Sequence, residues 1–135
     1  MNAFTGAILV AFGLFLVGLT VVVFAKPSVA ERFFTSFASS ARAHYTEQVV
    51  RLLIGASLII HSAAMWQQKF FWFVGWAIVF SSLVLILTPW QWHHRFGEKV
   101  LPIVIRRMKL FAIGLLAFGV LLIYGVLMAV SPNAA

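Results

Sequence analysis

Residues Leu110–Val130 read LFAIGLLAFGVLLIYGVLMAV, and none of them carries a charged side chain. A helix needs about 20 predominantly apolar residues to cross the hydrocarbon core of a bilayer. Three further runs, at 5–25, 48–66 and 70–88, have the same apolar character. Of the 135 residues, 63% are hydrophobic and 10% are charged, whereas about a quarter are charged in a soluble domain. The sequence therefore predicts an all-α membrane protein with four transmembrane helices in one integral membrane domain, residues 1–135.

Lysine and arginine residues are concentrated in two of the three connections between these runs. The first connection holds Lys26, Arg32, Arg42 and Arg51, and the third holds Arg95, Lys99, Arg106, Arg107 and Lys109. Basic loops stay in the cytoplasm, so we expect a multi-pass protein of the bacterial inner membrane with both termini on the periplasmic side. A short external turn is expected at 67–69. We also expect the first run to be retained, because no basic side chain precedes it as in a signal peptide.

The first connection has the pattern of an amphipathic helix at 28–45. Ser28 followed by Glu31 is typical of a helix start, and apolar residues then recur at helical spacing. We expect this helix to lie in the cytoplasmic membrane surface or to pack its apolar face on neighbouring spans. In the third connection, Pro102 suits the first turn of a helix, so we expect the fourth helix to begin there. The expected lipid or partner contacts are Phe33, Phe34, Phe37, Arg95, Arg106, Arg107 and Lys109.

The two halves of the chain resemble each other. Proline follows the first and third runs, an Arg-Phe pair comes a few residues later, and Gly13 and Gly75 lie at matching depths. This pattern suggests a parallel internal repeat of the kind found in some transporters, although a shared topology would also produce it. Glycine, alanine and serine in the first, second and fourth runs predict close contacts between helices.

His61 is an ionisable side chain well inside the second run. Intramembrane ionisable residues are functional candidates, and three roles are open for this one. It could form a hydrogen bond to a neighbouring span or partner, contact a quinone headgroup, or ligate a chlorophyll-type pigment. A haem would need a second axial ligand at the same depth. We therefore expect no intrinsic cofactor, only contact with the quinone, pigment or lipid of a partner complex.

Acidic and histidine residues in the connections offer one possible metal site. His44 and Glu47 could combine with His93, His94 and Glu98. Adjacent residues point to different sides of a helix, however, so His93 and His94 are poorly placed to act together. We expect no metal site, and we expect Glu47 to form a structural ion pair with Arg51 one helical turn later.

The segments Arg51-Leu52-Leu53-Ile54-Gly55 and PWQWHHRF at 89–96 resemble small four-span bacterial inner-membrane proteins, a likeness that implies no activity. The chain has no cysteine and no catalytic constellation that we recognise. We therefore expect a non-enzymatic accessory or structural subunit of a larger bacterial membrane complex, respiratory or photosynthetic. Its expected partners are anionic lipids and other integral membrane proteins, not nucleic acid. The alternatives are a small dimeric transporter or channel, whose candidate residues are Ser57, His61, Ser81 and Ser82, and a lipid-modifying enzyme with a cytoplasmic-surface metal site.

Overall fold

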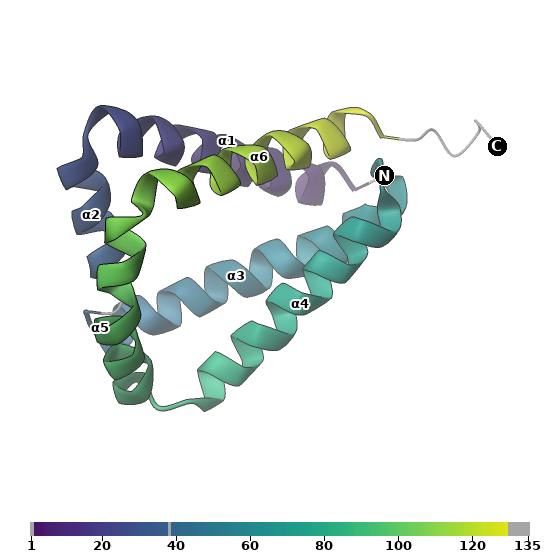
Figure 1. The fold of residues 1–135 in the computed structure, drawn as a ribbon. Helices are drawn as coiled ribbons and strands as arrows, with labels where there is room; N and C mark the ends of the chain where they lie inside the picture. Colours follow the sequence, from purple (N-terminus) through teal and green to yellow (C-terminus); the bar gives the residue numbers. More distant parts are fainter. Residues whose placement is uncertain (1, 38, 130–135) are drawn as a thin grey trace.

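The computed structural model describes residues 2–37 and 39–129, which form six α-helices and one 3-10 helix (Figure 1). Four stretches in this part of the chain are long and apolar enough to cross a membrane. The prediction of an all-α chain with four candidate membrane spans is confirmed. The elements are α1 (Ala3–Ala25), α2 (Pro27–Ser36), α3 (Ala41–His61), η1 (Ser62–Ala64), α4 (Gln68–Leu87), α5 (Trp90–Arg106) and α6 (Met108–Leu127).

The predicted single helix at 28–45 is wrong. Helix α2 ends at Ser36, and α3 begins at Ala41. Serine hydroxyls explain the break, because they compete with the helical hydrogen bonds of the backbone. Ser39 donates its hydroxyl proton to the Ser36 carbonyl at 2.6 Å, and Ser40 accepts from the Ala43 amide at 3.1 Å as the N-cap of α3. The second span therefore starts about two turns before the predicted position 48.

The prediction that Pro102 opens the fourth helix is also wrong. Pro102 lies inside α5, and the chain leaves helical geometry at Arg107, where φ is −111° and ψ is 23°. Proline removes one backbone donor from a helix, but the bonds on either side continue. The Arg107 amide still donates to the Ile103 carbonyl at 3.1 Å. Helix α6 starts at Met108 instead of 110, and position 130 of the predicted span lies outside the described residues.

The link between α3 and α4 also differs from the turn expected at 67–69. The 3-10 helix η1 follows α3 directly, and Lys69 belongs to the first turn of α4. Gln67 adopts a left-handed conformation, with φ 59° and ψ 50°, and so reverses the chain just before α4. The Trp66 amide donates to the Gly125 carbonyl at 3.2 Å, which holds this link against α6.

The four spans form two antiparallel pairs, α1 with α6 and α3 with α4 (Figure 1). Each pair crosses at two glycines that face each other, Gly13 with Gly119 and Gly55 with Gly75. A methyl group on Gly75 would lie 2.9 Å from the Gly55 carbonyl oxygen and 3.0 Å from the Ile59 backbone nitrogen. These glycines therefore let the backbones approach directly, which is how helices associate in lipid, where the hydrophobic drive between spans is absent.

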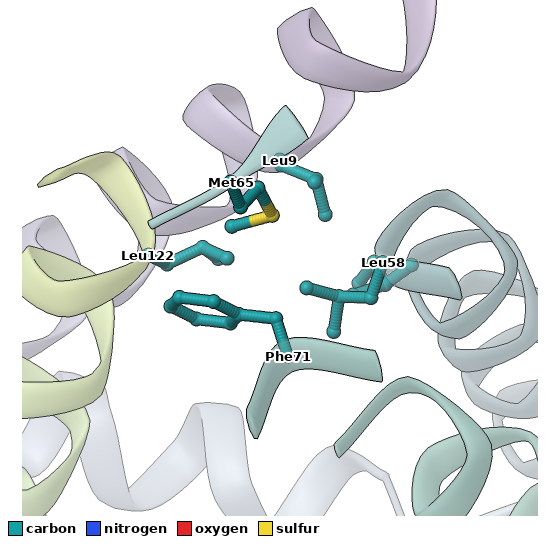
Figure 2. Packing of buried hydrophobic residues seen from close by; sticks show 6 residues of the cluster. Leu9, Leu58, Met65, Phe71 and Leu122 are labelled. Carbon is teal, nitrogen blue, oxygen red and sulfur yellow. The ribbon is translucent and has the colours of Figure 1, made fainter. Parts of the chain in front are cut away.

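The two pairs meet at one end and separate at the other. A buried cluster at the closed end, including Leu9, Leu58, Met65, Phe71 and Leu122, joins α1, α3, α4 and α6 (Figure 2). Toward the opposite end the pairs diverge, and α2 and α5 run from one pair to the other (Figure 1). This splayed end carries most of the basic side chains and is the end that the sequence assigns to the cytoplasm.

The two halves of the chain use equivalent positions for packing. Residues of α1 and α4 correspond at one constant separation in the sequence: Leu9 with Phe71, Gly13 with Gly75, and Thr20 with Ser82. All six are buried. Residues of α3 and α6 correspond in the same way, at a separation two positions longer: His44 with Met108, Gly55 with Gly119, and Leu58 with Leu122. These six are also buried. The unit α1–α2–α3 thus corresponds to the unit α4–α5–α6, in the order that an internal repeat requires.

The glycine crossings can be tested by adding one methyl group. Gly75→Ala should destabilise the protein by about 1–3 kcal/mol, because the new Cβ meets backbone atoms that cannot move aside. Gly114→Ala is the matched control, since a Cβ at Gly114 has nothing within 4 Å. Thermal unfolding in mild detergent measures both variants. Equal stability of the two would contradict direct backbone contact at the α3–α4 crossing.

Candidate functional site

Polar side chains gather at the splayed end, where α3, α4 and α5 meet. His44 and Gln48 of α3 are completely buried, and Ser82 of α4 is buried beside them in the antiparallel register. Burying polar groups between helices is costly unless hydrogen bonds compensate for the lost solvation. We call this group the polar cluster, and it consists of His44, Glu47, Gln48, Arg51, Ser81, Ser82 and His93.

Arg51 is held by serines more closely than by its predicted partner. Its Nε donates to Ser82 Oγ at 3.1 Å, and its Nη2 donates to Ser81 Oγ at 2.7 Å. Both hydroxyls give their own protons to the Ile78 carbonyl, so their lone pairs are free to accept. The Glu47 carboxylate lies 3.7 Å from Arg51 Nη1, within ion-pair distance but beyond a hydrogen bond. Both side chains of this pair are part-exposed, which weakens its contribution to stability.

Two histidines connect α5 to the α3–α4 pair. His44 Nε2 lies 3.1 Å from the Leu85 carbonyl oxygen, which can only accept, so this nitrogen carries a proton. In a neutral ring the other nitrogen, Nδ1, then has a lone pair. It lies 2.7 Å from His93 Nδ1, which must therefore be the donor. The chain of bonds runs from His93 through His44 to the α4 backbone, and it holds the start of α5 on the spans.

The pKa of His93 is lowered from its ordinary value of 6.5. Burial is the largest cause, and the neighbouring His44 is the next. Arg51 also lowers this pKa, whereas the Glu47 carboxylate raises it. His93 is thus more readily kept in the neutral form, in which Nδ1 carries the proton donated to His44.

Gln48 is the least satisfied member of the polar cluster. It has no exposed surface, and neither its Oε1 nor its Nε2 has a hydrogen-bond partner among the described residues. The cost of leaving such a group unpaired is about 1–3 kcal/mol. Packing alone does not require an amide at this place, because the equivalent position in the second half is the fully buried Ala112.

His61 lies at the closed end, away from the polar cluster. Thr5 donates its hydroxyl proton to the Asn2 carbonyl at 2.9 Å, so His61 Nδ1, 3.1 Å from Thr5 Oγ1, is the donor to that hydroxyl. A hydrogen bond to a neighbouring span, one of the predicted roles, is therefore present. The other ring nitrogen, Nε2, is buried against Gly6 of α1. A pigment or haem could reach that nitrogen only by displacing α1, so the geometry offers no support for ligation at this position.

The histidines and acids of the connections do not assemble as one group. His44 and His93 are together, while His94 Nε2 pairs with the Glu98 carboxylate at 3.2 Å on the same helix. In the part of the chain that the structure describes, no three His, Asp or Glu side chains are arranged to hold a metal ion. The residues of the predicted transporter stripe are likewise divided: His61 bonds to Thr5, and Ser81 and Ser82 bond to Arg51.

A large cavity lies beside the polar cluster, between α1, α2 and α3. Its volume is about 660 Å³, and it shares Glu47 and Arg51 with the polar cluster. Part of its wall is aromatic: Phe15 contacts Phe33 at 5.9 Å between ring centroids, and Phe33 contacts Phe37 at 4.8 Å. Its lining includes Phe12, Phe15, Phe33, Phe37, Arg42, Thr46, Glu47, Val50, Arg51 and Ile54. We call this space the lateral cavity.

The other residues predicted to contact lipid lie in two smaller groups. Arg106, Arg107 and Lys109 line a cavity of about 630 Å³ together with Glu31, but Arg95 does not belong to it. Phe34 and Phe37 line a third space of about 200 Å³ between α2 and α5, which also includes Glu47 and His93. Phe33 and Phe34 of α2, and Phe37 directly after it, are half-buried, so their rings face the protein at least in part.

The chain matches no model of a known protein family, no curated protein and no solved structure.

Several residues of this region were not identified from the sequence. No sequence pattern distinguishes Gln48, Phe12 and Phe15 from other residues of the spans, and none gives Ser81 and Ser82 a particular partner. A comparison of the two halves could have found part of the site. His44, Gln48 and Arg51 correspond to Met108, Ala112 and Leu115, so three polar positions of the first half are apolar in the second. Ser81 likewise corresponds to Leu19 of α1.

The histidine pair predicts a pH dependence of stability. A histidine with a lowered pKa binds protons more readily when the chain is unfolded, so stability is highest above the ordinary value of 6.5 and falls as the pH drops through it. The melting temperature should therefore decrease between about pH 7.5 and about pH 5.5. His93→Asn, which can donate but does not titrate in this range, should reduce that decrease, and Gln91→Asn, at an exposed position of the same helix, should not. An unchanged pH profile in His93→Asn would contradict the prediction.

The unpaired amide predicts a stabilising substitution. Gln48→Leu should raise the free energy of unfolding by about 1–2 kcal/mol, because an apolar side chain of similar shape removes a buried polar group without leaving another unpaired. Gln91→Leu is the control, since Gln91 is exposed on α5. Denaturant titration in detergent measures both. If Gln48→Leu lowered the stability, the amide would have to be satisfied in the folded protein.

Proposed function

We propose that this chain is a non-enzymatic integral membrane protein that binds a lipid-like amphiphile in the lateral cavity and acts as an accessory subunit of a larger bacterial membrane complex. The observation that carries the proposal is the lateral cavity itself, with aromatic rings on its wall and charged side chains on its rim. Under this proposal the splayed, basic end faces the cytoplasm and both termini face the periplasm, as the distribution of Lys and Arg favours.

The volume of the lateral cavity supports a small-molecule occupant. Sites for small molecules usually enclose about 300–1,000 Å³, are mostly apolar, and contain a few polar groups that orient the ligand. The lateral cavity, at about 660 Å³, lies within this range. Phe12, Phe15, Val50 and Ile54 provide a surface for an acyl chain, and Arg42, Glu47 and Arg51 provide polar contacts for a headgroup.

The position of the cavity supports an amphiphile over a water-soluble molecule. Phe12 and Phe15 belong to α1, and Val50 belongs to α3, both candidate membrane spans. Apolar side chains on the outer surfaces of these spans are also widely exposed, among them Val21 at 61% and Val49 at 64%. A molecule that enters between α1 and α3 would therefore come from the hydrocarbon side. The exposed faces of α4 and α6 remain available for bulk lipid or for the spans of a partner protein.

A small transporter is the second candidate, and the correspondence between the two halves favours it. Parallel repeats related by an axis along the membrane normal occur in secondary transporters, with the substrate site near mid-membrane. The polar residues of this chain are instead distributed unequally, since those that α3 contributes to the polar cluster have apolar equivalents in α6. This inequality favours a single binding site on one side of the molecule over a symmetric pathway through its centre.

The proposal is tested by blocking the lateral cavity. Val50→Trp should fill it, and Val49→Trp is the matched control, because Val49 is the neighbouring exposed residue of α3 and does not line the cavity. An amphiphile that co-purifies with the wild-type chain in mild detergent should be reduced by roughly tenfold in Val50→Trp, since overpacking of about 1–3 kcal/mol translates into a loss of that order. Native mass spectrometry measures the bound amount. Equal retention in both variants, or no bound amphiphile in the wild type, would contradict the proposal.

A further inference from the structure

The proposed function does not specify which amphiphile the lateral cavity binds. The charged side chains on the rim of the cavity favour one class of ligand. Two cations, Arg42 and Arg51, and one anion, Glu47, line the cavity, so the rim has a net charge of one positive unit. Arg42 is exposed, and Arg51 and Glu47 are part-exposed, so this positive charge is accessible to a ligand and attracts anionic groups. An occupant with one net negative charge would compensate it, whereas a neutral or zwitterionic occupant would not.

The hydrogen-bonding state of Arg51 points in the same direction. Ser81 and Ser82 accept from Nη2 and Nε, and the Glu47 carboxylate lies at 3.7 Å from Nη1, too far for a hydrogen bond. A guanidinium has more N–H donors than these two serines accept. Because Arg51 also lines the lateral cavity, its remaining donors are available to a ligand there. Arginine binds phosphate oxygens particularly well, since its planar fork matches their geometry.

The second half of the chain provides an internal comparison. Glu47 and Arg51 correspond to Phe111 and Leu115, and Thr46, which also lines the cavity, corresponds to Leu110. Only Arg42 has a charged equivalent, Arg106. The repeated fold therefore exists in one version with three charges at these positions and in another with one, so Glu47 and its charge are not required by the repeated fold itself. The comparison also predicts one site per chain and not two.

We infer, on the basis of the proposed function, that the lateral cavity binds one phospholipid with a phosphodiester headgroup of net charge −1, its phosphate at Arg42 and Arg51 and an acyl chain against the phenylalanines. Glu47 then limits the affinity by repelling the phosphate, and it limits the site to a single negative charge. A fatty-acid carboxylate has the same charge but fewer acceptor oxygens for the donors on the rim.

The inference is tested with the delipidated full chain in mild detergent. The probe is an equimolar mixture of phosphatidylglycerol, phosphatidylcholine and oleate, and native mass spectrometry counts each bound species. The wild type should retain one phosphatidylglycerol per chain, with a preference over phosphatidylcholine of roughly tenfold, because both lipids carry the phosphodiester but only phosphatidylcholine carries a choline cation, which the net positive rim repels. Arg42→Gln should remove most of this preference, and Glu47→Gln should increase it.

Arg32→Gln is the matched control, because Arg32 is an exposed arginine of the same connection and does not line the lateral cavity. It removes the same charge from the protein, and so it should leave the preference unchanged. Arg51→Gln would also remove the hydrogen bonds to Ser81 and Ser82, which contribute to the fold. Arg42 and Glu47 are therefore the positions that test the inference, because their substitution breaks no hydrogen bond described above.

The outcomes separate this inference from the function on which it rests. Binding of phosphatidylglycerol and phosphatidylcholine with equal strength, blocked by Val50→Trp, would overturn the inference and leave the lipid-binding function in place. Preferred retention of oleate would also overturn it, in favour of a carboxylate ligand. An equal effect of Arg42→Gln and Arg32→Gln would mean that lipid binds the general basic surface, and it would overturn the assignment to the lateral cavity. Absence of any bound probe would overturn both.

Discussion

The direct contact of backbones at two glycine crossings determines where the other groups of this protein can lie. In water, four amphipathic helices would be held together by burial of their apolar faces, but lipid is as apolar as those faces. The spans therefore need close packing, and Gly13 with Gly119 and Gly55 with Gly75 provide it. The buried cluster joins the two pairs at the closed end, and toward the other end they diverge, with α2 and α5 between them.

The divergence of the two pairs explains the position of both the polar cluster and the lateral cavity. Where helices α3 and α4 continue beyond their crossing, α5 contributes His93, and the space between α1 and α3 is bounded by the aromatic side chains of α2. Arg51 can occupy this region because the Ser81 and Ser82 hydroxyls are already oriented by the Ile78 carbonyl. The short helices thus do more than connect spans, since they bring side chains to the gap that the spans leave.

Much of the fold could be predicted from the sequence, because the requirement of about 20 apolar residues per span is a property of the bilayer and not of this protein. The four spans follow from it. The small residues of the first, second and fourth runs also predict the contacts of Gly13, Gly55 and Gly119, but they do not predict that Gly55 meets Gly75 of the third run. The breaks were harder to locate. The helix at 28–45 was predicted as continuous because its apolar spacing continues through Tyr45, whereas the Ser36, Ser39 and Ser40 hydroxyls divide it. Proline at position 102 predicts a helix start, but Pro102 lies in the interior of α5, where the neighbouring backbone hydrogen bonds are kept.

The candidate site was harder still to predict, because its partners are distant in the sequence. Glu47 and Arg51 were expected to pair from their spacing on one helix, but the shorter bonds of Arg51 go to α4. No local pattern relates His44 to His93, or Phe15 of α1 to Phe33 of α2, since each pair depends on how the spans diverge. The comparison of the two halves is the one sequence signal that does reach the site. Met108, Ala112 and Leu115 fill, with apolar groups, positions that in the first half hold a histidine, an amide and a guanidinium. The spans pack with either set, so the buried positions could be predicted from the repeat, whereas the hydrogen bonds that the polar set makes to α4 and α5 could not.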